Sequence, residues 1–156
     1  HTNDAAGAIP RLVNMGVKPF VVAPALSLII AQRLVRRLCE NCRTEVALEG
    51  ALKAQVDTVL AAMPKDVRAE LPEAPKFFHA TGCDVCKNLG YKGRVGIYEM
   101  LEVSEAIQGL IFKEAPMSDF KKTAVAEGMV TMGQDGIIKA SQGLTDVEEV
   151  FRVAGE

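Results

Sequence analysis

Several residue types and segments that would indicate a specialised protein are missing from this chain of 156 residues. Tryptophan is absent and aromatic residues make up only 5%, so few side chains can stack on the bases of single-stranded nucleic acid. The 18 basic residues are balanced by 20 acidic ones, whereas nucleic-acid binders usually carry an excess of positive charge. The longest apolar stretch, from Phe20 to Ala31, is shorter than the ~20 residues that a membrane-spanning helix needs. We therefore expect a globular protein that neither binds nucleic acid nor spans a membrane.

The four cysteines of the chain form two pairs with the same spacing. Two residues separate Cys39 from Cys42, and two residues separate Cys83 from Cys86. This spacing lets both thiolates of a pair reach one ion from a single turn. Two such turns brought together form the tetrahedral all-cysteine shell of structural zinc sites. The sequence therefore predicts one zinc ion bound by these four residues.

Two disulfides, or four unpaired thiols, are the alternatives to zinc. No signal peptide is recognisable and the composition is that of a cytosolic protein, so disulfides should be reduced. His79 lies close to Cys83 in the sequence, but with four cysteines available we expect it to be peripheral to the metal. The predicted zinc is structural, because a closed shell leaves no position for a substrate.

The spacing of apolar residues predicts more helix than strand. Leu52, Val56 and Leu60 recur at helical spacing between the cysteine pairs, and we expect this helix to be an excursion that neither pair needs for metal binding. Thr145 and Glu148 have the spacing of a capping box, which predicts the start of the last helix. The expected strands cover residues 32–38 and 91–101, and the expected helices cover 5–15, 18–30, 52–63, 65–71, 104–113, 118–128, 131–143 and 145–153.

Several blocks of the sequence resemble the secretion ATPases of type II secretion and type IV pilus assembly. The resemblance covers nearly the entire chain apart from the segment between the cysteine pairs. Any one block alone is a weak signal, but together they are highly specific. The blocks are HTNDAAGAIPRL (1–12), AQRLVRRLC (31–39), GCDVC (82–86), GYKGRVGIYE (90–99), EGMVTM (127–132), DG (135–136), GLT (143–145) and EEV (148–150).

This resemblance implies a C-terminal fragment of a hexameric, cytoplasmic motor driven by Mg-ATP. His1 corresponds to the histidine of the family's His box, which lies near the γ-phosphate in the intact protein. Arg33 and Arg36 are candidates for contacts with nucleotide or a neighbouring subunit, since guanidinium groups match phosphate and carboxylate geometry, although a solvated face is the alternative. The sequence contains no G-x-x-x-x-G-K-[ST] motif, so we expect this chain alone not to hydrolyse ATP.

The sequence as a whole predicts a helix-rich α+β protein in three segments. Residues 1–37 are expected to be the remnant of a RecA-like P-loop ATPase core. Residues 38–103 form the four-cysteine zinc module with a helical insertion at about 49–74, and residues 104–156 form a small C-terminal helical domain. The expected partners are the other subunits of a homo-hexamer and inner-membrane platform proteins, which would hold the motor at the bacterial inner membrane. The alternative is a free-standing zinc-ribbon module that recruits a protein partner, and the sequence upstream of His1 would distinguish the two.

Overall fold

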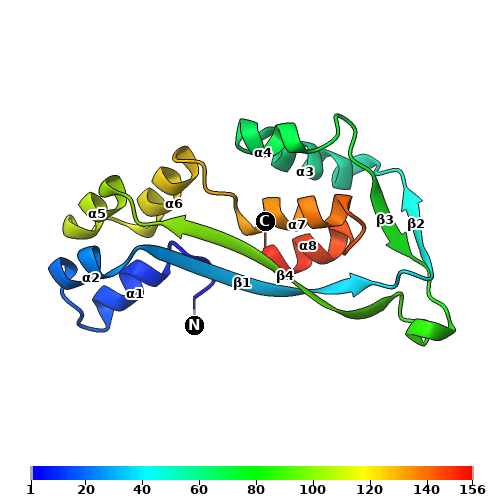
Figure 1. Ribbon diagram of the computed structural model, residues 1–156, viewed down its shortest axis with the longest axis horizontal. Helices are drawn as coiled ribbons and strands as arrows, with labels where there is room; N and C mark the ends of the chain where they lie inside the picture. Colours follow the sequence, from blue (N-terminus) through cyan, green and yellow to red (C-terminus); the bar gives the residue numbers. More distant parts are fainter. Residues whose placement is uncertain (1, 156) are drawn as a thin grey trace. The chain divides into compact units, whose positions relative to one another are not determined.

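The computed structural model describes residues 2–155 and confirms a helix-rich α+β fold with two small sheets (Figure 1). Strand β1 pairs with β4, and β2 pairs with β3. None of the helices in the described part of the chain is long and apolar enough to cross a membrane. The elements in chain order are α1 (Ala8–Asn14), α2 (Pro19–Ala25), β1 (Leu28–Leu38), β2 (Arg43–Val46), α3 (Gly50–Ala61), α4 (Lys65–Glu70), β3 (Phe77–Ala80), the 3₁₀ turn η1 (Asp84–Cys86), β4 (Tyr91–Glu102), α5 (Glu105–Phe112), α6 (Met117–Ala126), α7 (Met132–Ser141) and α8 (Val147–Ala154).

The chain divides into two compact units, and each consists of two separate stretches of sequence. Among the described residues, the first unit comprises 2–32 and 98–131, and the second comprises 33–97 and 132–155. Strands β1 and β4 contribute to both units. The three contiguous segments expected from the sequence stay a prediction.

The first unit consists mainly of helices that pack around one apolar cluster. Helices α1, α2, α5 and α6 supply most of its buried side chains, together with the end of β4. Helix α5 begins where the sequence predicts, because the Ser104 hydroxyl accepts a hydrogen bond from the backbone N–H of Ile107 at 3.2 Å and so caps the helix. The fully buried members include Ile9, Val22, Leu101, Ile107, Ile111 and Phe120.

The expected helix over residues 18–30 is wrong in its last turn. Helix α2 ends at Ala25, and β1 begins at Leu28. The residues from Leu28 to Ala31 are all apolar, so their sequence has neither the period of a helix nor the alternation of a strand. Pairing with β4 decides the matter, since only the strand satisfies the backbone hydrogen-bonding groups of both segments.

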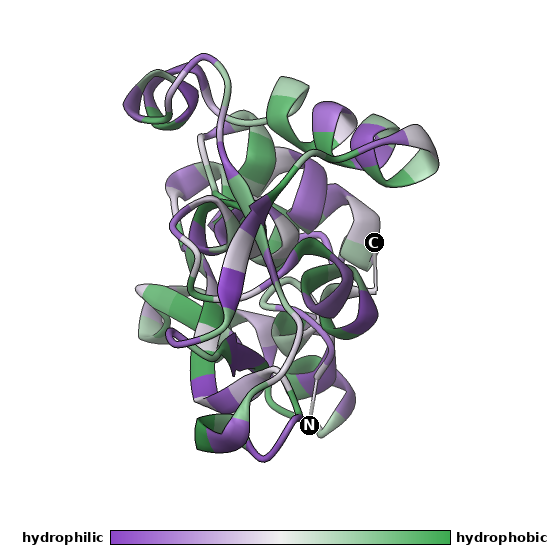
Figure 2. Cartoon of the chain, turned by 90° about the vertical axis from the view of Figure 1, so that its right-hand side faces the viewer, coloured by the Kyte–Doolittle hydropathy of each residue, from purple (hydrophilic) through white to green (hydrophobic). Residues whose placement is uncertain are grey.

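The second unit is built around α3, α7 and α8. The predicted apolar stripe of α3 is confirmed: Val56 is fully buried and packs in one cluster with Ile137 of α7 and Val150 of α8. The side-chain amide of Gln134 also donates a hydrogen bond to the backbone carbonyl of Ala62, just after α3, at 3.0 Å. The apolar face of α3 thus closes the core of this unit, and the expectation that neither cysteine pair needs α3 for metal binding stays a prediction. Apolar and polar stretches alternate along the helices, as expected for helices with one buried face (Figure 2).

The antiparallel pair of β2 and β3 was not predicted from the sequence. The two strands are antiparallel, with Arg43 opposite Ala80 and Val46 opposite Phe77. Each strand has only four residues, which is too short for an alternating pattern to be recognised. Strand β2 leads the chain from the first cysteine pair to α3, and β3 leads it back from α4 toward the second pair.

The start of α8 also differs from the expectation. Asp146 is the N-cap, and its side chain accepts a hydrogen bond from the backbone N–H of Glu149 at 2.8 Å. Thr145 does not cap the helix, because its hydroxyl donates to the backbone carbonyl of Arg36 at 2.9 Å. The capping box of Thr145 and Glu148 is thus replaced by an aspartate cap one residue later.

Candidate metal centre

The first cysteine pair follows directly on β1. Cys39 is buried, and the backbone N–H groups of Cys42 and Arg43 both donate to its carbonyl, at 3.2 and 3.0 Å. These bonds close a tight turn that points both sulfur atoms to one side. Strand β2 begins at Arg43, so the turn lies between two strands.

The second cysteine pair lies on the short 3₁₀ turn η1. The backbone N–H of Cys86 donates to the carbonyl of Cys83 at 3.2 Å, and Lys87 then adopts a left-handed conformation that ends the turn. Gly82 before the turn has φ +101, and a Cβ there would lie 2.8 Å from the carbonyl oxygen of Asn88. Only glycine fits this position without displacing backbone, which explains the glycine directly before the pair.

The two turns bring all four sulfur atoms together. The Sγ atoms of Cys39, Cys42, Cys83 and Cys86 lie within 4.8 Å of one another, and the closest approaches are 3.8 Å. A tetrahedral ion with bonds of about 2.3 Å to sulfur holds its ligands about 3.8 Å apart. A disulfide bond would need about 2 Å, and none of the four cysteines is in a disulfide. The four side chains therefore have the spacing needed to hold one metal ion.

The surroundings of Cys86 favour a thiolate. Its sulfur accepts hydrogen bonds from the backbone N–H of Cys83 at 3.2 Å and of Gly90 at 3.3 Å. Burial opposes ionisation, but these N–H groups and the neighbouring thiols outweigh it and lower the pKa of Cys86 to about 6. Burial raises the pKa of Cys42 to about 12. Thiolates are the form of cysteine that binds metal. A cation at the centre would stabilise the four thiolates, which otherwise repel one another at these distances.

The other residues predicted to act at a site are not part of this cluster. His1 lies outside the described residues. Arg33 is half-buried on β1, and Arg36 lies further along the same strand. His79 is on β3 and does not belong to the four-cysteine group. A contact of Arg33 or Arg36 with nucleotide or with another subunit stays a prediction.

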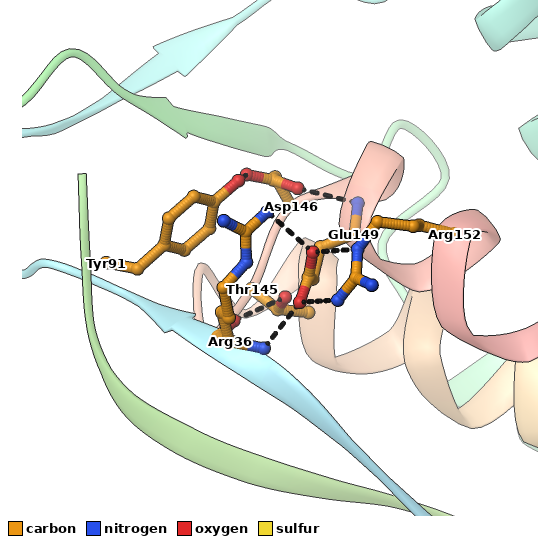
Figure 3. Close-up of polar contacts among 6 residues, drawn as sticks. All are labelled: Arg36, Tyr91, Thr145, Asp146, Glu149 and Arg152. Atoms are coloured by element: carbon orange, nitrogen blue, oxygen red, sulfur yellow. Dashed lines mark hydrogen bonds and ion pairs between the residues drawn. The ribbon is translucent and has the colours of Figure 1, made fainter. Parts of the chain in front are cut away.

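An ion-pair network around the buried carboxylate of Glu149, which was not predicted from the sequence, includes Arg36 (Figure 3). The side chain of Glu149 has no exposed surface and accepts hydrogen bonds from the guanidinium groups of Arg36 at 2.8 Å and of Arg152 at 2.8 and 2.7 Å. Burial opposes the charge of Glu149, but the two arginines and the backbone N–H of Arg36 outweigh it and lower its pKa to about 2. The i,i+3 spacing of Glu149 and Arg152 on one helix could have predicted their ion pair from the sequence. The contact of Glu149 with Arg36 on β1 could not have been predicted from a local pattern.

Tyr91 and Asp146 complete this network. The guanidinium carbon of Arg36 lies 4.0 Å from the centre of the Tyr91 ring, a cation–π contact. The hydroxyl of Tyr91 donates a hydrogen bond to the carboxylate of Asp146 (Figure 3). Burial and this neighbouring carboxylate raise the pKa of Tyr91 above its ordinary value, so the phenol stays protonated. The network joins β1, the start of β4 and α8 within the second unit.

The first unit contains a buried carboxylate of its own. Glu99 on β4 is 4% exposed and accepts a hydrogen bond from the backbone N–H of Ala5 at 2.5 Å. The contact joins residues far apart in the sequence, and Ala5 directly follows the segment that resembles the His box. Glu99 therefore fixes the backbone at the end of that segment.

Comparison with known proteins identifies the family to which these features belong. The family model described as "Type II/IV secretion system protein" matches residues 1–152. The chain is 42% identical over 154 residues to the type IV pilus assembly ATPase PilB of Pseudomonas aeruginosa, an alignment that covers 98% of this chain and 25% of that protein. It is 41% identical to PilB of Thermus thermophilus, covering 97% of this chain and 16% of the relative. It is 37% identical to the type II secretion system ATPase E of Vibrio cholerae, covering 100% of this chain and 29% of the relative.

These alignments span almost all of this chain but less than a third of each of the three relatives. Proteins that share only a fold need not share sequence, whereas these relatives are 37–42% identical over 151–156 residues. This identity also agrees with the resemblance that the motifs carry. The chain belongs to the type II/IV secretion system protein family.

Proposed function

We propose that this chain is the C-terminal portion of a hexameric ATPase that powers type IV pilus assembly or type II protein secretion. The observation that carries the proposal is the identity of 42% and 37%, over nearly the whole chain, to proteins named as ATPases of these two machines. The working partners are the other subunits of the hexamer and inner-membrane platform proteins. The protein then acts in the cytoplasm, at the inner membrane.

In this proposal the four cysteines hold one structural zinc ion. Cys39 and Cys42 supply two thiolates from the end of β1, and Cys83 and Cys86 supply two from η1 just before β4. Zinc when bound would offset part of the negative charge of the four thiolates and cross-link the two turns, with no open position for a substrate. The four cysteines would thus orient β1 and β4 within the second unit and take no part in the reaction.

ATP hydrolysis requires a part of the motor that supplies a phosphate-binding loop. In P-loop ATPases this loop is the glycine-rich G-x-x-x-x-G-K-[ST] motif, which holds the β- and γ-phosphates. The sequence of this chain does not contain that motif. We propose that this chain alone is inactive. In the complete motor His1 would lie near the γ-phosphate of Mg-ATP, and Arg33 and Arg36 would contact nucleotide or a neighbouring subunit. The RecA-like segment 1–37 would be the end of the nucleotide-binding core.

Chimeras test this proposal directly. This chain would replace the matched portion of PilB from P. aeruginosa in one protein, and of the type II secretion ATPase E from V. cholerae in another. The purified chimeras would be assayed for hexamer formation and ATP turnover, and the host strains for pili or secreted protein. We expect ATP turnover in at least one chimera, and the machine that it restores identifies the role. Folded chimeras that neither assemble nor hydrolyse ATP would contradict the proposal and favour an interaction module.

A further inference from the structure

A second group of potential metal ligands lies in the same unit as the cysteines. His79 on β3 meets Asp146 and Glu148 at the start of α8, and one ligand atom from each lies within 4.8 Å of the other two. The group joins two segments that are far apart in the sequence, one with His79 and one with Asp146 and Glu148. Neither the motifs nor the proposed function assigns these residues a role in metal binding.

Asp146 is the fixed member of this group. It is 1% exposed, its Oδ1 accepts the backbone N–H of Glu149 at 2.8 Å, and its Oδ2 accepts the hydroxyl of Tyr91. Carboxylates that bind metals are generally held by such hydrogen bonds, which orient the remaining lone pairs. The Asp146 carboxylate is therefore already in place before a ligand arrives.

The charges around the group are not balanced by arginine or lysine. Arg36 and Arg152 lie nearby, but both form their ion pairs with Glu149. Within residues 2–155, Asp146 and Glu148 have no basic residue at ion-pair distance. A cation could therefore bind these two carboxylates without displacing an arginine or a lysine.

His79 and Glu148 are exposed, and their side chains make no hydrogen bond or ion pair with another described residue. Both are therefore available, and both can move to the bonding distance of about 2 Å without breaking a hydrogen bond or an ion pair of their side chains. An imidazole and two carboxylates form a ligand set that suits first-row divalent metals such as Zn²⁺, Co²⁺ and Mn²⁺.

We propose that His79, Asp146 and Glu148 form a second divalent-metal site, separate from the four cysteines. The metal would join β3 to the start of α8, and water would complete its coordination. Binding would hold the β2–β3 strand pair against α8 and so support the turn that leads to the second cysteine pair. This site does not depend on the proposed ATPase role.

Metal titration of the purified chain tests this site. The protein would carry His1→Ala, so that His79 is its only imidazole, and one equivalent of zinc for the cysteines. We expect calorimetry to detect a second equivalent of Zn²⁺, with a dissociation constant raised at least about tenfold by His79→Ala and likewise by Glu148→Gln. Glu70→Gln, an exposed carboxylate outside the group, is the control and should leave binding unchanged. Co²⁺ added as the second equivalent should shift the ring proton resonances of His79.

Two results would overturn the proposal. One is the absence of a second equivalent at micromolar to submillimolar Zn²⁺. The other is a second equivalent that weakens in His79→Ala but not in Glu148→Gln, which is the behaviour of a lone surface imidazole. Asp146 stays unchanged in all variants because it caps α8, and circular dichroism would verify that each variant is folded.

Discussion

Arg36 on β1 and Glu149 on α8 are joined by two hydrogen bonds, one from the backbone N–H to Oε1 at 2.9 Å and one from the guanidinium to Oε2 at 2.8 Å. The carboxylate thus binds both the strand and its side chain. A strand residue expected to face nucleotide or a neighbouring subunit is here part of the internal structure of the second unit. The two roles are compatible, since about half of the Arg36 side chain stays exposed.

Replacing Glu149 should destabilise the second unit. Glu149→Gln removes a buried charge that faces two arginines, and we expect a loss of about 2 kcal/mol in the free energy of unfolding. The expected loss is smaller than the loss on breaking a fully buried ion pair, because about half of each arginine side chain is exposed to solvent. Chemical denaturation measures the loss. Arg37→Gln, which breaks the exposed pair with Glu40, is the control and should cost less than about 1 kcal/mol.

The same carboxylate predicts a dependence on pH. The pKa of Glu149 is about 2 in the folded protein, below its ordinary value of 4.5. Its stabilising contribution is therefore complete above about pH 5 and is lost as the pH falls toward 2. The difference in stability between the native protein and Glu149→Gln should shrink over that range. A difference that stays constant from pH 6 to pH 3 would contradict the assigned pKa.

The four cysteines should bind one zinc ion per chain. Elemental analysis of protein purified without added metal should find about one equivalent, and Cys83→Ser should lose most of it. Because zinc binding can contribute on the order of 10 kcal/mol to folding, this variant should also have a much lower melting temperature. Val85→Ser changes an exposed residue in the same turn and is the matched control. A folded protein without metal, with both cysteine pairs oxidised, would show that the disulfide alternative is correct.

Two glycines in helices should respond in opposite directions to alanine. A Cβ at Gly136 of α7 would overlap Cγ1 of the buried Val150 on α8, so Gly136→Ala should destabilise the protein by about 1–3 kcal/mol. A Cβ at Gly109 of α5 meets nothing within 4 Å, so Gly109→Ala should stabilise by about 0.5–1 kcal/mol. Adding Val150→Ala to Gly136→Ala should recover part of the loss. Equal effects of the two alanines would mean that helices α7 and α8 do not pack as described.

The helix between the cysteine pairs should be needed for stability. Val56 of α3 is 1% exposed in the core shared with α7 and α8, so Val56→Ala should cost about 1–3 kcal/mol. Thermal unfolding would measure this, with Ala54→Ser on the exposed side of α3 as the control. Deletion of residues 49–74 should lower the melting temperature even with zinc bound. A deletion variant as stable as the native protein would show that this segment is a dispensable insertion.

The sequence by itself was sufficient for features that depend on neighbours along the chain. The equal spacing of the two cysteine pairs predicted that their four sulfurs meet, and the structure confirms the meeting. The apolar stripe of α3 and the strand at residues 91–101 were likewise predicted, since a side chain's position on a helix or strand follows from the local period alone. The family also followed from the sequence, because its motifs are short local blocks.

Only the tertiary structure decided the features that depend on residues far apart. Leu28 to Ile30 are in a strand because β4 is present to pair with them, and α3 closes the core because α7 and α8 present apolar faces to it. The ion pair of Glu149 with Arg36 depends on where β1 lies in space. The approach of His79 to the start of α8 depends in the same way on the position of β3. The physical reason is that burial and ion pairing are set by distance in space, and a local pattern contains no information on which distant segment will supply the partner.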